Sequence, residues 1–132
     1  MRAFIDTNVF IYALEKHPIH GEKAKAILEK VDAGEVDGII STLVLLEVCW
    51  YLEAAKRYEA MALTAERVTR SRVNLVEVAG ADVVEAAELK KVYEGVDFND
   101  LVNYSVMRRL GLGAVYTNDA HFRRLPGVTM LF

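Results

Sequence analysis

The fold is signalled most clearly by the stretch Arg2-Ala3-Phe4-Ile5-Asp6-Thr7-Asn8. Its apolar part, Ala3 to Ile5, has the length and composition of a short buried strand. Asp6-Thr7-Asn8 follows with short polar residues, which are common where the chain leaves a strand. Their side chains can accept hydrogen bonds from the free backbone amides at the start of a helix. The sequence therefore predicts that the chain opens with a strand, a carboxylate and a helix.

Strands and helices alternate along the rest of the chain. From His20 to Val31, apolar residues recur with the three-and-four spacing of a helix that buries one stripe, and Gly34 follows as a stop. Short apolar runs predict further strands at 38–40, 74–78, 114–117 and 128–131, and the intervening pattern predicts helices at 43–56, 59–70, 82–92 and 97–110. This alternation indicates an α/β fold with three layers, in which helices cover both faces of a central, mainly parallel sheet.

Local signals mark the start of two of these helices. Ser41 or Thr42 can cap the helix that follows the second strand. Asp82-Val83-Val84-Glu85 has the spacing of a capping box, which predicts that the helix over 82–92 opens at Asp82. No repeat or linker divides the chain, so residues 1–132 are expected to form a single domain.

Length and composition are those of an ordinary folded domain. With 132 residues, the chain can bury roughly two thirds of the surface that its unfolded form exposes. Hydrophobic residues make up 53% and charged residues 27%, which excludes a disordered or low-complexity protein. The longest apolar stretch, Leu43 to Leu52, is too short and too charged to span a bilayer, and the amino terminus lacks the pattern of a signal peptide. We therefore expect a soluble cytoplasmic protein.

Cysteine content and net charge argue against two classes of function, a zinc protein and a simple nucleic-acid clamp. Cys49 is the only cysteine, and one cysteine with three scattered histidines gives no spacing typical of a zinc site. The net charge of −3 lacks the basic footprint of a simple nucleic-acid clamp. Binding of a polyanion would therefore need local arginines, such as Arg123 and Arg124, together with divalent cations that offset acidic groups.

Four carboxylates stand in otherwise apolar surroundings, and they are Asp6, Glu47, Asp100 and Asp119. An isolated buried charge costs many kcal/mol, so buried carboxylates are normally paired, hydrogen-bonded or bound to a metal. Asp6 and Asp119 each follow a predicted strand, and parallel strands end at one edge of the sheet, where α/β folds bind ligands. Asp100 and Glu47 lie on helices that can start at the same edge. The four acids are therefore expected to converge.

Converging carboxylates predict a site for one or two Mg²⁺ or Mn²⁺ ions, which prefer hard oxygen ligands. In such sites the metal activates an attacking water and stabilises the leaving oxygen of a phosphodiester, without a histidine or serine nucleophile. We therefore expect metal-dependent phosphodiester hydrolysis. Asp6 and Asp100 are expected as direct ligands, with Glu47 and Asp119 completing the set.

Each acid also has a structural interpretation, and for Glu47 it is a side chain that reaches solvent between helices. Asp6 can cap the helix that follows it, and Asp119 suits a turn after a strand. Asp97 and Asp100 are spaced so that either can satisfy free amides at the start of a helix. The interpretation of Asp97 stays open between a cap, an acid that supports the ligands, and a further ligand.

Aromatic residues and a histidine near these acids are assigned structural roles. His121 is expected as a surface or packing residue, and Phe122 as the anchor of its loop in the core. Trp50, Tyr51 and Tyr104 are expected to fill the core or a dimer interface rather than to stack on bases.

The residues around the acids form a recognisable set, which is Asp6-Thr7-Asn8, Ser41 through Glu47, Asp97-x-x-Asp100, and Thr117-Asn118-Asp119 followed by His121-Phe122. In order, spacing and flanking residues, this set resembles the PIN domain family. Within that family the chain is most similar to the small single-domain proteins typified by the VapC toxins of toxin–antitoxin pairs, over essentially its whole length. The resemblance implies a PIN-like three-layer fold and a magnesium- or manganese-dependent ribonuclease.

The resemblance also implies roles for residues and partners. Asp6, Glu47, Asp100 and Asp119 match the acidic positions of the family. Polar support is implied for Asn8, Ser41, Asp97 and Thr117. Family members often form homodimers, and toxin-type members are held inactive by a small antitoxin protein, so both partners are expected by analogy. The resemblance is compatible with a toxin and with a stand-alone nuclease.

Three other functions compete with RNA cleavage. A phosphatase of the haloacid dehalogenase type also opens with a strand and an aspartate, but its motif expects a second aspartate where this chain has Asn8. A DNA flap nuclease shares the metal chemistry, but this chain is too short for the helical arch that such enzymes carry. The alternative from another class is a noncatalytic nucleic-acid or protein binding module that keeps the PIN fold. The presence of all four acids favours the ribonuclease.

Overall fold

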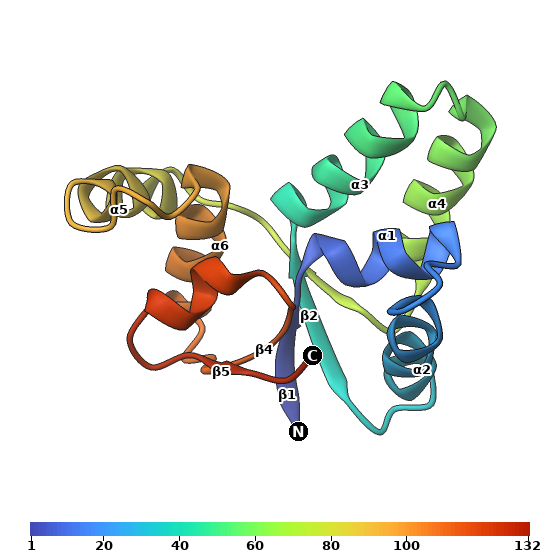
Figure 1. Cartoon of the computed structure of the whole chain (residues 1–132), viewed down its shortest axis with the longest axis horizontal. Coiled ribbons are helices and arrows are strands. Elements are labelled where there is room, and N and C mark those ends of the chain that lie inside the picture. Colours follow the sequence, from blue (N-terminus) through green and yellow to red (C-terminus); the bar gives the residue numbers. More distant parts are fainter.

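The computed structural model describes residues 1–132 and places a five-stranded sheet between two groups of helices (Figure 1). The strands are β1 (Arg2–Ile5), β2 (Asp37–Ser41), β3 (Asn74–Val76), β4 (Ala114–Tyr116) and β5 (Thr129–Met130). The helices are α1 (Thr7–Glu15), α2 (Gly21–Asp32), α3 (Thr42–Ala54), α4 (Tyr58–Arg70), α5 (Gly80–Lys90), α6 (Phe98–Arg109) and a short 3₁₀ helix, η1 (Ala120–Arg124). The predicted alternation of strands and helices is confirmed.

All the strand pairings are parallel, and the order across the sheet is β3-β2-β1-β4-β5. The chain first moves outward from β1 through β2 to β3, with α1 to α4 as connections, and then returns through α5 and α6 to place β4 on the other side of β1. In Figure 1, α1 and α2 lie on one side of the sheet and α5 and α6 on the other. The predicted three-layer α/β/α architecture is therefore confirmed. Strand order reverses between β1 and β4, which is where such folds bind ligands.

The central strand β1 is buried on both faces, as its sequence predicts. Phe4 is in register with Ile39 of β2 and with Val115 of β4, and all three side chains are buried. Gly38 lets α2 pack closely over this region, because a β-carbon there would lie 2.7 Å from Ile5 and 2.9 Å from Val31. Burying a large aliphatic or aromatic side chain contributes about 1.5–3 kcal/mol, so β1 anchors the residues that follow it.

One predicted helix start is wrong. The sequence predicted that α5 opens at Asp82, but α5 begins at Gly80 and Asp82 is the third residue of its first turn. The Asp82 carboxylate accepts a hydrogen bond from the Ala79 backbone N–H at 2.7 Å and two from Arg109 of α6, at 2.9 and 3.0 Å. An acid at this position that reaches back to the residue before the helix supplies half of a capping box. The contact with Arg109 lies far along the chain, so local spacing did not reveal it.

Other differences concern the ends of elements. Helix α3 ends two residues before the predicted Lys56, whose φ of 57° is outside the helical region. Strand β3 ends at Val76 rather than at residue 78, and α5 ends at Lys90 rather than at residue 92. The helix η1 was not predicted. None of the helices combines the length and the hydrophobicity needed to cross a bilayer.

The aromatic residues divide between core and surface. Phe122 is fully buried, which confirms its predicted role as an anchor, and Tyr104 is buried with its hydroxyl donating to the Pro126 carbonyl at 2.7 Å. Trp50 is 51% exposed on α3, so it does not fill the core.

Candidate metal centre

The four acids come from four segments that meet at one end of the sheet. Asp6 directly follows β1, and Asp119 follows β4 after a gap of two residues. Because β1 and β4 are paired in parallel, both acids leave neighbouring strands at their carboxyl ends. Asp100 lies in the first turn of α6 and Glu47 in the second turn of α3. The reversal of strand order thus brings together residues from both ends of the chain.

Asp6 is 5% exposed, and its hydrogen-bond partners are all neutral. One carboxylate oxygen accepts from the Thr7 backbone N–H at 2.8 Å, where Asp6 caps α1, and the other accepts from the Thr117 hydroxyl at 2.8 Å. Burial raises the pKa of Asp6 to about 6; the two hydrogen bonds oppose that rise, while the charges of Glu47 and Asp119 add to it. Asp6 is therefore both a helix cap and a carboxylate whose charge the protein does not balance.

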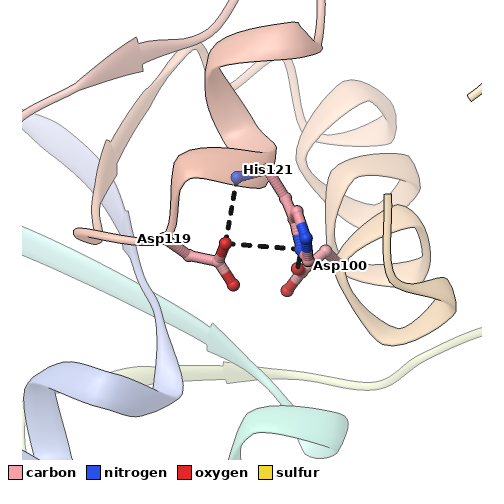
Figure 2. Close-up of side chains that lie close together, drawn as sticks. All are labelled: Asp100, Asp119 and His121. Carbon is pink, nitrogen blue, oxygen red and sulfur yellow. Dashed lines mark hydrogen bonds and ion pairs between the residues drawn. The ribbon is translucent and has the colours of Figure 1, made fainter. Parts of the chain in front are cut away.

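Asp100, Asp119 and His121 form a close group of potential ligands (Figure 2). One ligand atom from each residue lies within 4.8 Å of the other two. His121 Nδ1 lies 2.9 Å from Asp100 Oδ2 and 3.3 Å from Asp119 Oδ1. The His121 backbone N–H also donates to Asp119 Oδ1 at 2.9 Å, at the start of η1. This tight turn places both side chains beside α6.

The pKa of Asp100 is strongly raised. Only 8% of the residue is exposed, and burial, followed by the charges of Asp6 and Asp119, raises the pKa of Asp100 to about 9. Without a cation, this carboxyl group therefore holds its proton at neutral pH. A bound metal ion inverts that preference because its charge favours the ionised carboxylate.

Glu47 faces the same region from α3. Its Oε1 accepts a hydrogen bond from the Thr7 hydroxyl at 2.9 Å, and its Oε2 accepts from the Asn99 side-chain amide at 3.4 Å. Burial, reinforced by nearby acidic charges, raises the pKa of Glu47. Asp6 and Glu47 do not belong to the group formed by Asp100, Asp119 and His121, whose ligand atoms all lie within 4.8 Å of one another. The four acids are therefore not equivalent.

Thr117 and Asn8 hold the ends of the two strands together. The buried Thr117 hydroxyl donates to Asp6 and accepts from the Asp119 backbone N–H at 3.0 Å and from the Asn8 side-chain amide at 3.2 Å. Asn8 also donates to Asn118 Oδ1 at 2.9 Å. These contacts fit the supporting roles that were predicted for both residues.

Ser41 and Asp97, which were also assigned supporting roles, act differently. The Ser41 hydroxyl donates to Asn103 at 2.6 Å and accepts from the Val44 backbone N–H at 3.2 Å, so it caps α3 and has no hydrogen bond to an acid. Asp97 stands at the start of α6 but makes no capping hydrogen bond through its side chain. Its charge instead contributes to the raised pKa of Asp100.

Sequence reasoning missed three residues at this site. Asn99 donates to Glu47, and the Tyr12 hydroxyl donates to Asn118 Oδ1 at 3.1 Å, which braces the segment that leads to Asp119. His121 was assigned to the surface or to packing, but its side chain is 40% exposed and lies against two carboxylates. Its spacing of two residues from Asp119 was the available signal.

The donor set suits a divalent cation. No lysine or arginine nitrogen lies within 4.0 Å of any of the four acids. Asn8 Oδ1 is buried and has no hydrogen-bond partner. Buried carboxylates without a cation are costly, and carboxylate oxygens are the ligands that Mg²⁺ and Mn²⁺ accept. The residues present therefore fit such an ion.

Comparisons with known proteins agree with this geometry. The family model described as the PIN domain matches residues 3–128 of the chain. No curated protein matches it by sequence.

The chain is also similar to solved structures. VapBC2 from Rickettsia felis, bound to a DNA fragment from its promoter, is 24% identical with a TM-score of 0.75, and the match covers 99% of this chain and 98% of that chain. VapC20 from Mycobacterium tuberculosis, described as a Sarcin-Ricin loop cleaving toxin, is 21% identical with a TM-score of 0.75 and coverages of 89% and 90%. DNA-bound VapBC from Salmonella typhimurium is 21% identical with a TM-score of 0.72 and coverages of 99% and 98%. At these identities the likeness is one of fold.

Proposed function

This chain belongs to the PIN domain family, and we propose that it is a divalent-metal-dependent endoribonuclease whose centre is built by Asp6, Glu47, Asp100 and Asp119. Membership was predicted from the motifs, and the match over residues 3–128 confirms it. One observation carries the proposal of activity: buried carboxylates with raised pKa values gather where strand order reverses, and no lysine or arginine pairs with them.

Bound here, one or two Mg²⁺ or Mn²⁺ ions would supply a Lewis acid that activates water and offsets charge on the scissile phosphate. The residues of the chain prepare that chemistry. The Thr117 hydroxyl and the Thr7 backbone amide fix both oxygens of Asp6, and the Thr7 hydroxyl orients Glu47. Burial keeps bulk water away from Asp6 and Asp100, which strengthens their interaction with a cation.

We propose RNA as the substrate because the chain shares its fold with VapC20, which is described as cleaving the Sarcin-Ricin loop. Arg123 and Arg124 are exposed on η1, within five residues of Asp119, and we propose that they hold the phosphate backbone. Replacing both by alanine should weaken binding of single-stranded RNA in a fluorescence anisotropy titration, with a reduced dependence on salt. Unchanged RNA affinity and cleavage would rule out this role.

We further propose that the protein is the toxin of a VapBC-type pair, with a small antitoxin as partner, and that it forms a homodimer. The structural neighbours described as VapBC complexes support the antitoxin. Exposed apolar side chains support contacts with other chains: Leu46 and Trp50 lie on α3, and Val83 and Val84 lie on α5. A separate, mostly apolar cavity of about 330 Å³ lies among α1, α2 and α4.

Expression in a bacterial host tests the toxin role. A toxin should arrest growth, and co-expression with the product of a small neighbouring reading frame should restore it and yield a complex on gel filtration. A nuclease that leaves growth unaffected and binds no such product would be a stand-alone enzyme. Light scattering of the purified protein measures the homodimer directly.

Cleavage of a mixed single-stranded RNA pool tests the activity. Wild-type protein should cut in Mg²⁺ or Mn²⁺ and stop in chelator, and Asp6→Asn and Asp119→Asn should abolish cutting. Asp37→Asn is the matched control, because this exposed aspartate at the start of β2 pairs only with Arg2. Equal cutting by all variants would identify a contaminating nuclease, and metal binding without any cutting would favour the noncatalytic binding module.

A further inference from the structure

His121 is the only member of the close group that offers nitrogen rather than oxygen as a ligand atom. The turn η1 draws its ring toward Asp100 and Asp119, and the ring is neither packed in the core nor free in solvent, with its side chain 40% exposed. Figure 2 shows the two carboxylates facing each other with the imidazole beside them. The ring therefore lies where a metal ion between the carboxylates would meet it.

The two distances from His121 Nδ1 to the carboxylate oxygens match edges of a coordination sphere. Ligand atoms at about 2.1 Å from a six-coordinate ion lie about 3 Å from their neighbours on the same edge. His121 Nδ1 is 2.9 Å from Asp100 Oδ2 and 3.3 Å from Asp119 Oδ1, so this nitrogen can occupy a corner adjacent to each of the two oxygens with little movement. We propose that His121 Nδ1 is a direct metal ligand, and that it shifts the preference of the centre from Mg²⁺ toward first-row transition-metal ions such as Mn²⁺. This inference rests on the proposed metal centre and adds a ligand to it.

The chemistry of the ligands explains the expected selectivity. Mg²⁺ demands oxygen ligands and gives up its waters reluctantly, whereas first-row transition metals accept imidazole nitrogen. Replacing a water by His121 Nδ1 therefore favours Mn²⁺ over Mg²⁺. A centre made of Asp6, Glu47, Asp100 and Asp119 alone would lack this discrimination.

A second arrangement makes a distinct prediction. The 2.9 Å separation also suits a hydrogen bond from His121 Nδ1–H to Asp100, in which case His121 is a positioning residue and never touches the metal. The two arrangements differ in whether nitrogen is bonded to the ion. Pulsed electron paramagnetic resonance of bound Mn²⁺ measures this directly, because a coordinated ¹⁴N produces hyperfine coupling to the metal.

The experiment uses the full chain with Mn²⁺ alone, without RNA. Wild-type protein should bind Mn²⁺ and show ¹⁴N coupling, and His121→Gln should lose the coupling. In titrations, His121→Gln should lower Mn²⁺ affinity by on the order of tenfold and Mg²⁺ affinity by a smaller factor. His20→Gln is the matched control, since the His20 ring packs on Tyr12 and Phe132 and forms no ion pair with any of the four acids, and it should leave both measurements unchanged.

The outcomes separate this inference from the proposed function. Saturable Mn²⁺ binding without ¹⁴N coupling in the wild type would overturn the His121 ligand and leave the metal centre standing. Coupling that persists in His121→Gln would also overturn it. Absence of saturable Mn²⁺ binding would overturn both. Thermal unfolding in metal-free buffer, where the variants should match the wild type within a few degrees, checks that each is folded.

Discussion

Asp82 and Asp100 are buried aspartates that each occupy the third position of a helix, in α5 and α6, and these two helices pack against each other. Arg109 donates two hydrogen bonds to Asp82, and its guanidinium holds the pKa of that carboxyl below its usual range. Asp100 meets burial and the carboxylates of Asp6 and Asp119 instead, which raise its pKa to about 9. The same residue type at the same helical position thus has opposite electrostatics.

The contrast distinguishes a structural carboxylate from one that we assign to function. At Asp82 the protein supplies its own cation, so the buried charge is balanced within the fold. At Asp100 it supplies other acids and no lysine or arginine, so without a cation this carboxyl stays protonated at neutral pH, and a divalent cation would stabilise its ionised form. Buried carboxyls with strongly raised pKa values and no basic partner cluster at functional sites. For this reason we propose a metal ion at Asp100 and no metal ion at Asp82.

The largest difference between the two aspartates is expected in catalysis. Asp100→Asn should reduce RNA cleavage by about 1,000-fold, because metal sites supply several kcal/mol of transition-state stabilisation. Asp82→Asn should leave the rate close to that of the wild type at 25 °C. Single-turnover cleavage in Mn²⁺ measures both. A comparable loss in the two variants would show that activity depends on the fold of α5 and α6 rather than on the metal ligands.

In metal-free buffer, the two kinds of carboxyl should make the stability of the protein depend on pH in opposite directions. Raised pKa values mean that folded Asp6 and Asp100 keep protons that the unfolded chain releases above about pH 4, so stability falls as pH rises toward 9. Asp6 accounts for a loss of stability of about 3 kcal/mol, and this loss is complete slightly above pH 6. The lowered pKa of Asp82 contributes stability above about pH 4 that is lost as pH falls further.

Urea unfolding across a pH series measures these windows. The Asp100→Asn variant should flatten the decline between about pH 4 and 9, most clearly above pH 6, where the contribution of Asp6 is complete, since it removes a carboxyl that keeps its proton only in the folded chain. Asp82→Asn should alter only the acid limb. An unchanged alkaline slope in Asp100→Asn would show that this carboxyl is not the one that titrates.

Adding metal should fully stabilise only those variants that keep all four acids of the metal centre. A ligand at 100 times its dissociation constant adds about 2.7 kcal/mol to the folded state. Wild type and Asp82→Asn should both gain this stability when Mn²⁺ is added, and a chelator should remove the gain. Asp100→Asn should gain much less. Differential scanning calorimetry checks the series, and equal gains in all three proteins would move the metal away from Asp100.

The smallest effect is expected on metal-free stability. Asp82→Asn should cost about 2 kcal/mol, because it weakens the hydrogen bond from Ala79 and leaves Arg109 without its charged partner. Asp100→Asn should be neutral or stabilising, since asparagine is uncharged and does not need to take up the proton that Asp100 must bind when the chain folds at neutral pH. Glu85→Gln, which breaks the exposed pair with Arg108, is the control and should cost less than about 1 kcal/mol. Greater destabilisation by Asp100→Asn than by Asp82→Asn would reverse the assignment.

Much of the fold was predictable because its signals are local. The apolar run before Asp6, the helical spacing over 20–31 and the caps near Ser41 depend only on residues a few positions apart. The start of α5 was mispredicted because Asp82 was interpreted as the first residue of the helix, whereas it is the third and accepts from the Ala79 backbone N–H; its partner Arg109 lies on another helix and gave no local signal. The four acids were selected from their apolar settings, and their roles as ligands stay predictions. His121 was missed because its position depends on the turn of η1 against α6.

The sequence by itself determined the order of strands and helices, the parallel α/β class and the points at which carboxylates follow buried segments, since each depends on neighbouring residues. Only the tertiary structure decided which buried carboxylate is neutralised. Packing of α5 on α6 places Arg109 beside Asp82, and pairing of β1 with β4 places Asp6 and Asp119 near Asp100. Electrostatic energy depends on separation in space, which strand order and helix packing set, and not on separation along the chain.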